Sequence, residues 1–226
     1  YLRNRNGSVS RFYRNGDSGA DEINDIEIDG NNIWLATING VIVLDKSTKT
    51  EKHKFDVANG LPPKSINKIF LDSRGNAYIG AESDRLYMID REFKISTGNS
   101  LMYGSTINKV FSFSKNKSGV IWVATGGNGI FGFLNDSVSA INRSNGLMSS
   151  YCYSILADSE NNVWIGHEKG FSRYNSESGI VSVFGSDYAK NGVCNPDGMF
   201  ESADRKIFIG TTEGLIIYDS KKDKKH

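Results

Sequence analysis

One short pattern recurs along the chain at a nearly constant spacing, and it constrains the fold more than any other feature. The pattern is an apolar residue, an aromatic residue and an aliphatic residue, followed by Ala or Gly. Its aromatic residue occurs five times, at spacings of 44, 44, 42 and 44 residues: Trp34, Tyr78, Trp122, Trp164 and Phe208. All three tryptophans of the chain stand in this column. Such a period indicates a repeat architecture in which each copy is one supersecondary unit.

Each copy is flanked by the same succession of short apolar runs and turn residues. An alternating run such as Ile66–Leu71 precedes the aromatic, and turn residues such as Asp72–Asn76 separate the two. A glycine and a third run follow, as in Phe171–Tyr174, and a more polar run such as Ile180–Phe184 closes most copies. The runs alternate with period 2 and are rich in β-branched and aromatic residues, which is typical of strands joined by tight turns.

Four strands in about 44 residues, repeated five times, predict an all-β fold: a β-propeller of five four-stranded blades. The tryptophans are then packing residues between blades. We expect one domain over residues 1–226, with these repeat units: 23–57, 66–98, 107–143, 152–185 and 195–219.

The two ends of the chain suggest how the ring closes. The fifth unit has only three strands, and residues 8–13 stand before the first unit as an orphan strand. We expect this N-terminal strand to pair with Leu215–Tyr218 and to complete the last blade, which removes an open edge. The alternative is a fragment of a larger propeller with about seven blades. The first residue is Tyr1, and the chain is interpreted as a part of something longer.

Charge and hydropathy exclude several function classes. Lys and Arg number 27 against 26 acidic residues, so no overall field selects nucleic acid or an anionic membrane. No apolar stretch approaches the roughly 18 residues that span a bilayer, and no direct membrane insertion is expected of this segment. Cys152 and Cys194 are too few for a disulfide scaffold and are expected to be free, half-buried thiols, although their disulfide state stays open.

Catalytic signals are weak. The three histidines lack metal-ligand spacing, and no nucleophile elbow, phosphate-binding loop or dinucleotide fingerprint occurs. We therefore expect no metal, no cofactor and no enzymatic activity.

Propellers carry function in the loops at one end of their strands. Two loop sets, one between second and third strands and one entering each next blade, bring aromatic, amide and charged residues to the same end. This mixture suits a carbohydrate or peptide, and an exposed imidazole there would titrate near pH 6.5. The candidate ligand-binding residues are Arg85, Tyr103, Tyr151, His167, Lys169, Asn195 and Asp197.

Two stretches resemble a known family. Asn59-Gly60-Leu61-Pro62, running to Tyr78-Ile79-Gly80, and Asn145-Gly146-Leu147, running to Trp164-Ile165-Gly166, resemble the two-component regulator propeller repeat. The second unit departs from the family pattern with Tyr78 for Trp and Arg85 for glycine. The resemblance implies a periplasmic or extracellular sensor region of a bacterial hybrid two-component system, with neighbouring signalling domains. Such sensors often detect glycan breakdown products and usually have about seven blades per ring.

Three functional classes remain open. A module that senses an oligosaccharide or another small ligand is the first. A protein–protein interaction scaffold is the second, and it would show an exposed apolar patch. A propeller lyase is the third, and it would need a convergent acid–base or metal cluster.

Overall fold

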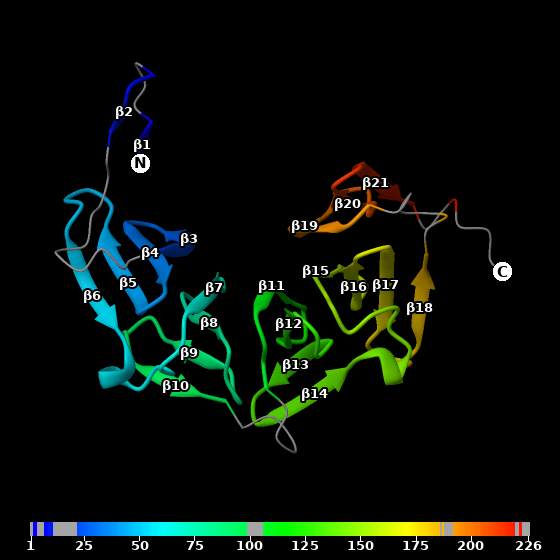
Figure 1. The fold of residues 1–226 in the computed structure, drawn as a ribbon, viewed down its shortest axis with the longest axis horizontal. Coiled ribbons are helices and arrows are strands. Elements are labelled where there is room, and N and C mark those ends of the chain that lie inside the picture. The colour runs from blue at the N-terminus through cyan, green and yellow to red at the C-terminus, as the bar shows by residue number, and fades with distance from the viewer. Residues whose placement is uncertain are drawn as a thin grey trace. The chain divides into compact units, whose positions relative to one another are not determined.

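The alternating segments form antiparallel strands, as their period-2 pattern predicts. The computed structural model describes residues 2–3, 7–10, 22–98, 106–185, 187, 192–219 and 222. Sheets 1 to 5 are numbered in chain order, and their consecutive strands are hydrogen-bonded neighbours (Figure 1). Sheet 1 contains β3 Ile23–Asp29, β4 Asn32–Thr37, β5 Gly40–Asp45 and β6 Glu51–Phe55. Sheet 2 contains β7 Ile66–Leu71, β8 Ala77–Ala81, β9 Tyr87–Ile89 and β10 Ile95–Thr97.

The remaining three sheets repeat this meander. Sheet 3 contains β11 Val110–Lys115, β12 Ile121–Thr125, β13 Ile130–Leu134 and β14 Ser137–Ile141. Sheet 4 contains β15 Ser154–Ala157, β16 Asn162–His167, β17 Gly170–Asn175 and β18 Val181–Phe184. Sheet 5 contains β19 Cys194–Glu201, β20 Ile207–Thr211 and β21 Gly214–Tyr218. The aromatic column lies on the second strand of every sheet, as predicted.

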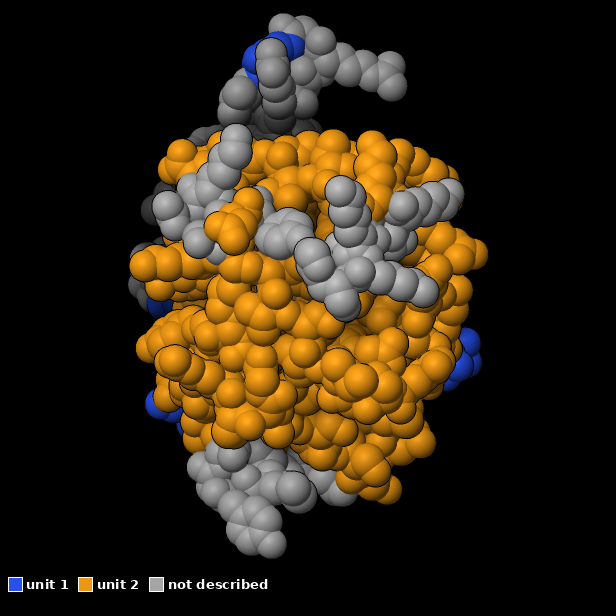
Figure 2. Space-filling model, turned by 90° about the vertical axis from the view of Figure 1, so that its right-hand side faces the viewer, with its two compact units in different colours: residues 1–81, 87–96 blue, residues 82–86, 97–226 orange. Residues whose placement is uncertain are grey.

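The chain divides into two compact units, coloured separately in Figure 2. Unit 1 is made of residues 1–81 and 87–96, and unit 2 of residues 82–86 and 97–226. Unit 1 contains sheet 1 and, except for Thr97, sheet 2; unit 2 contains sheets 3, 4 and 5. The expectation of one domain over residues 1–226 stays a prediction.

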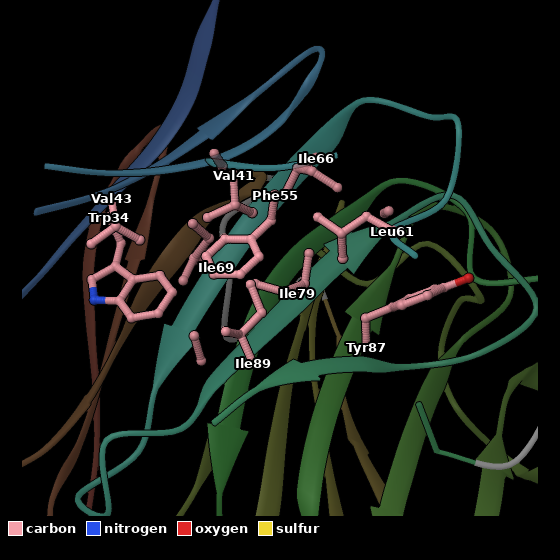
Figure 3. Packing of buried hydrophobic residues seen from close by; sticks show 13 residues of the cluster. Trp34, Val41, Val43, Phe55, Leu61, Ile66, Ile69, Ile79, Tyr87 and Ile89 are labelled. Carbon is pink, nitrogen blue, oxygen red and sulfur yellow. The ribbon is translucent and has the colours of Figure 1, made fainter. Parts of the chain in front are cut away.

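The core of unit 1 lies between its two sheets. Figure 3 shows Trp34 and Phe55 of sheet 1 in one cluster with Ile69, Ile79 and Ile89 of sheet 2. The Trp34 side chain is 2% exposed, and its ring stacks on Phe93 with the centroids 5.7 Å apart. Burial of so large an aromatic surface is a main source of stability.

Unit 2 repeats this packing. Trp122 of sheet 3 lies in a cluster with Ile155 and Ile165 of sheet 4. Trp164 of sheet 4 lies in a cluster with Ile207 and Ile209 of sheet 5. The exposed fractions of the two indoles are 3% and 2%, which confirms that the tryptophans pack between sheets.

The Asn-Gly-Leu motif has a local structural role. Single 3-10 turns occupy Val57–Asn59 and Arg143–Asn145, and each has a reciprocal capping box with the residue before it. Gly60 and Gly146 follow in the left-handed conformation, with φ of 101° and 102°, which glycine adopts without strain. Leu61 and Leu147 then enter the cores at 3% and 2% exposure.

The N-terminal strand differs from the expectation in the part that the structure describes. β2 Val9–Ser10 pairs with β1 Leu2–Arg3, and sheet 5 has three strands. Residues 11–13 of the expected closing strand lie outside the described residues, so closure of the last blade stays a prediction. Among the described residues, no helix is long and apolar enough to cross a membrane.

Candidate functional site

The turn between the second and third strands has a recurrent structural residue. In sheets 1, 3 and 5 it is a threonine, the last residue of the second strand, whose hydroxyl donates to the carbonyl oxygen of the glycine that opens or directly precedes the third strand. The donor–acceptor distances are 3.0, 2.8 and 3.1 Å for Thr37, Thr125 and Thr211 respectively. In sheet 4 this position belongs to His167. The imidazole therefore replaces a short turn-stabilising hydroxyl.

His167 connects three segments of unit 2. Its Nδ1 lies 3.0 Å from the carbonyl oxygen of Tyr151, and since a carbonyl only accepts, Nδ1 carries the proton. Its Nε2 lies 2.9 Å from Oγ of Ser172 and therefore accepts the hydroxyl proton. Ser172 Oγ in turn accepts from the backbone N–H of Met148 at 3.3 Å. The neutral imidazole is thus satisfied at both nitrogens.

This placement corrects the expectation for His167. The side chain is completely buried, and burial lowers its pKa to about 4, against a smaller raising effect of the hydrogen bond to Tyr151. The imidazole was expected to face a ligand and to titrate near pH 6.5; instead it lies inside the protein. The physical reason is that desolvation disfavours the charged form of a buried imidazole.

The His167 network helps to fix the loop that enters sheet 4. Within the same loop, the carbonyl oxygen of Ser150 accepts from the N–H groups of Gly127 and Gly129 at 3.2 and 2.8 Å. The Cys152 N–H donates to the carbonyl oxygen of Thr125 at 3.0 Å. The turn between β12 and β13 and the loop that enters sheet 4, which belong to the two predicted loop sets, are therefore hydrogen-bonded together.

Tyr151 projects from this fixed loop. Its side chain is 55% exposed, although its carbonyl oxygen is held by His167. A Cβ placed on Gly127 would lie 3.6 Å from Cζ and 3.7 Å from Oη of the Tyr151 ring. The ring therefore lies over the backbone of Gly127.

The other candidate residues have different surroundings. Lys169, Asn195 and Asp197 are exposed, and Asp197 has a left-handed φ of 52°. The Arg85 guanidinium pairs with the neighbouring carboxylate of Asp84 at 2.9 Å. Tyr103 lies outside the described residues. The contacts described above thus join two of the seven candidates, Tyr151 and His167.

A cavity of about 290 Å³ lies beside the Tyr151 loop in unit 2. Its lining includes Asn128 of one loop and Ser150 of the other, together with Phe131 of β13 and Asn142, which follows β14. Asn128 lies in the turn between β12 and β13, within one of the two predicted sets of ligand loops, but neither Asn128 nor Asn142 is among the candidates that the sequence indicated. The available signal was the Asn142-x-x-Asn145-Gly146 spacing, which matches Asp56-x-x-Asn59-Gly60.

The thiols are structural. Cys152 and Cys194 are free, as expected, but both are fully buried rather than half-buried. Burial raises the pKa of Cys194 to about 11 and raises that of Cys152 further. Cys152 Sγ lies 4.0 Å from His167 Nδ1, but that nitrogen donates its proton to the carbonyl oxygen of Tyr151. In the described part of the chain, no cluster of three His, Cys, Asp or Glu residues has the arrangement of a metal site.

Comparison with known proteins agrees with this architecture. Residues 146–169, which include Trp164 and His167, match the family model described as two component regulator propeller, in agreement with the resemblance seen in the sequence. No curated protein matches the chain.

Three solved structures show the same fold. The extracellular domain of the hybrid two-component system BT3049 from B. thetaiotaomicron is 20% identical with a TM-score of 0.71, over 88% of this chain and 28% of that one. The corresponding BT4673 domain is 20% identical with a TM-score of 0.69, over 95% and 28%. Virginiamycin B lyase from Staphylococcus aureus is 16% identical with a TM-score of 0.62, over 86% and 68%. The chain therefore has a β-propeller fold and spans just over a quarter of the two B. thetaiotaomicron domains.

Proposed function

We propose that this chain is the ligand-sensing propeller module of a two-component-type signalling protein, located in the periplasm or outside the cell. The proposal draws on the family repeat at residues 146–169 and on the two similar structures, which are extracellular domains of hybrid two-component systems. The ligand in this proposal is a carbohydrate or another small molecule. Neighbouring signalling domains would respond to its binding.

The observation that carries the proposal is the presentation of Tyr151. An aromatic ring that is 55% exposed stands on a loop whose carbonyls and amides are already hydrogen-bonded. Because that loop is ordered before a ligand arrives, little conformational entropy is lost on binding. An aromatic ring with a hydroxyl edge supplies both apolar contact area and a hydrogen-bonding group. This combination suits a sugar ring, which has apolar faces and a polar rim.

The mechanism of the proposed module is binding without covalent chemistry. A ligand would rest on Tyr151 and make hydrogen bonds to neighbouring loops, and its binding energy would favour one arrangement of adjoining signalling domains over another. The described thiols have raised pKa values, and the His167 imidazole is buried with both nitrogens engaged. These groups are poorly suited to nucleophilic or acid–base catalysis near neutral pH.

A scaffold for a protein partner is the second candidate. Sheet 5 presents three large apolar side chains, Phe200, Leu215 and Ile217, with exposed fractions of 65%, 62% and 54%. Exposed apolar patches of this kind are common at protein interfaces.

Calorimetric titration against a panel of neutral and acidic oligosaccharides tests the first candidate. Tyr151→Ala should raise the Kd of the ligand that binds about tenfold, which corresponds to roughly 1.4 kcal/mol. Phe200→Ala, which truncates another exposed aromatic of unit 2, is the matched control and should leave Kd unchanged. If Tyr151→Ala has no effect while Phe200→Ala abolishes capture of a protein partner, the scaffold function replaces the sensor function.

A further inference from the structure

We infer that the cavity beside the Tyr151 loop is a binding site for an uncharged ligand group with several hydroxyls or amides. The inference rests on the proposed function and narrows its ligand class. The cavity lies within unit 2, between the turn that joins β12 to β13 and the segment that follows β14. Its volume of about 290 Å³ is at the lower end of the range for small-molecule sites.

The lining is polar but carries no formal charge among the described residues. Its polar side chains are those of Thr106, Asn128, Asn142 and Ser150, and Phe131, which is 2% exposed, supplies an aromatic surface. A charged group that entered would lose part of its hydration with no opposite charge to replace it, and this loss is costly. A neutral polar group would lose much less. The cavity therefore selects against charge.

Each polar side chain has one hydrogen-bonding atom engaged within the protein. The Thr106 hydroxyl donates to Oδ1 of Asn108 at 3.3 Å, so its oxygen remains an acceptor. Asn128 Nδ2 donates to the carbonyl oxygen of Thr106 at 2.6 Å, so its Oδ1 remains an acceptor for a ligand. Asn142 Oδ1 accepts from the backbone N–H and the hydroxyl of Ser144 at 2.8 and 2.5 Å, so its Nδ2 remains a donor. Ser150 Oγ accepts from the Arg143 N–H at 3.3 Å, which leaves its O–H as a donor.

The site therefore offers two acceptors, Asn128 Oδ1 and Thr106 Oγ1, and two donors, Asn142 Nδ2 and the Ser150 hydroxyl, all neutral. Hydroxyl groups both donate and accept, and amides carry separate donor and acceptor atoms, so either can use this set. The set is also rigid. Asn142 is fixed by its capping box with Asn145, and the Ser150 carbonyl oxygen is fixed by the Gly127 and Gly129 amides. Gly127 lies in the cavity wall and also against the Tyr151 ring. A ligand on Tyr151 can thus extend a polar group into the cavity.

The probes for the test are D-glucose, D-galactose, D-mannose and N-acetylglucosamine, compared with D-glucuronate and D-galacturonate. Side-chain amide resonances of Asn128 and Asn142 are followed by NMR in the full chain. We expect neutral sugars to shift both resonances and the uronates to shift them at least tenfold more weakly at equal concentration. A stronger response to the uronates, or no shift of either amide with any probe, overturns the inference.

Asn142→Asp is the discriminating variant. Aspartate caps a helical turn as well as asparagine, so the turn should stay folded, while the ligand-facing donor becomes a negative charge. Neutral-sugar affinity should fall at least tenfold. Asn39→Asp, in the exposed β4–β5 turn of unit 1, is the matched control and should bind normally. Unchanged binding by Asn142→Asp together with lost binding by Tyr151→Ala would reject the cavity but keep the sensor function. The reverse pattern would keep the cavity and reject the role of Tyr151.

Discussion

The indole N–H of Trp164 donates to Oδ2 of Asp158 at 2.8 Å, and neither of the other two tryptophans has such a partner. Asp158 stands six residues before its tryptophan, in the turn between β15 and β16. The position six residues before Trp122 is Asn116, and Trp34 follows the shorter turn formed by Gly30 and Asn31. The indole nitrogens of Trp34 and Trp122 are buried without an acceptor in the described part of the chain. The tryptophan of sheet 4 therefore has a polar partner that its equivalents in sheets 1 and 3 lack.

Asp158→Asn should destabilise unit 2 by about 2–4 kcal/mol, because buried donors would lose their acceptor. Asp158 Oδ2 also accepts from Asn162 Nδ2 at 2.9 Å, while Oδ1 accepts two backbone amides. The Oδ1 of an asparagine can accept from the backbone amides. Its Nδ2, however, is a donor and cannot accept from the indole N–H of Trp164. Urea unfolding measures the change. Asp90→Asn is the control, since the Oδ1 of Asp90 accepts two backbone amides in a comparable turn and asparagine retains that atom. Equal losses in the two variants would contradict the role assigned to the indole bond.

Asn116→Asp is the reciprocal change and should stabilise the protein by about 1 kcal/mol. Asn116 Oδ1 already accepts from the Val120 N–H at 2.9 Å, as Asp158 Oδ1 accepts from the turn that it caps. A carboxylate would place an acceptor where the amide nitrogen now lies and could receive the Trp122 N–H. Urea unfolding shows whether the free energy of unfolding rises or falls in this variant. A net loss of stability would mean that burying the carboxylate costs more than the new bond contributes.

Lowering the pH should destabilise the protein through His167. Its folded-state pKa of about 4 lies below the usual value of 6.5, so the unfolded chain binds the proton more readily. This contribution to stability is complete above pH 6.5 and declines as the pH falls toward 4, by about 3 kcal/mol in all. His167→Thr, which introduces the residue found at the equivalent turns, should remove that part of the pH dependence. Unfolding free energies at pH 7 and pH 4.5 are compared for the two proteins, and parallel slopes would refute the assignment.

Native Cys152 and Cys194 should resist alkylation. With a pKa near 11, only about one Cys194 thiol in a thousand is ionised at pH 8, and the thiolate is the reactive form. Both side chains are also fully buried. Iodoacetamide should therefore modify two thiols in urea and essentially none in the folded protein, as counted by intact mass. Rapid labelling of the folded protein would show that sheet 4 or sheet 5 opens frequently.

Trp122→Ala should cost about 3–5 kcal/mol, the range for removing a large buried aromatic. Its indole is 3% exposed and contacts Tyr174 with ring centroids 5.7 Å apart. Phe200→Ala removes an aromatic that is 65% exposed and should change stability by less than 1 kcal/mol. Thermal or urea unfolding measures the stability of the two variants. A folded Trp122→Ala variant of normal stability would rule out the packing role.

The sequence by itself determined the repeat, the strands and the core. Strand alternation has a period of two residues, and turn chemistry depends on residues that are adjacent in the chain, so both are visible locally. The aromatic column was therefore assigned correctly to second strands and to packing. The Asn-Gly-Leu motif was also recognised, and its structure is a capping box, a left-handed glycine and a buried leucine.

Only the tertiary structure decided which loop residues are accessible. His167 ends β16 and Lys169 follows two residues later in the turn to β17, yet the first is fully buried and the second is exposed. The difference arises because the Tyr151 carbonyl and the Ser172 hydroxyl, brought from two other segments, enclose the imidazole. The cavity likewise combines Asn128, Asn142 and Ser150 from separate loops. Burial and shared hydrogen bonds depend on contacts between segments distant in sequence, and a local pattern does not encode them.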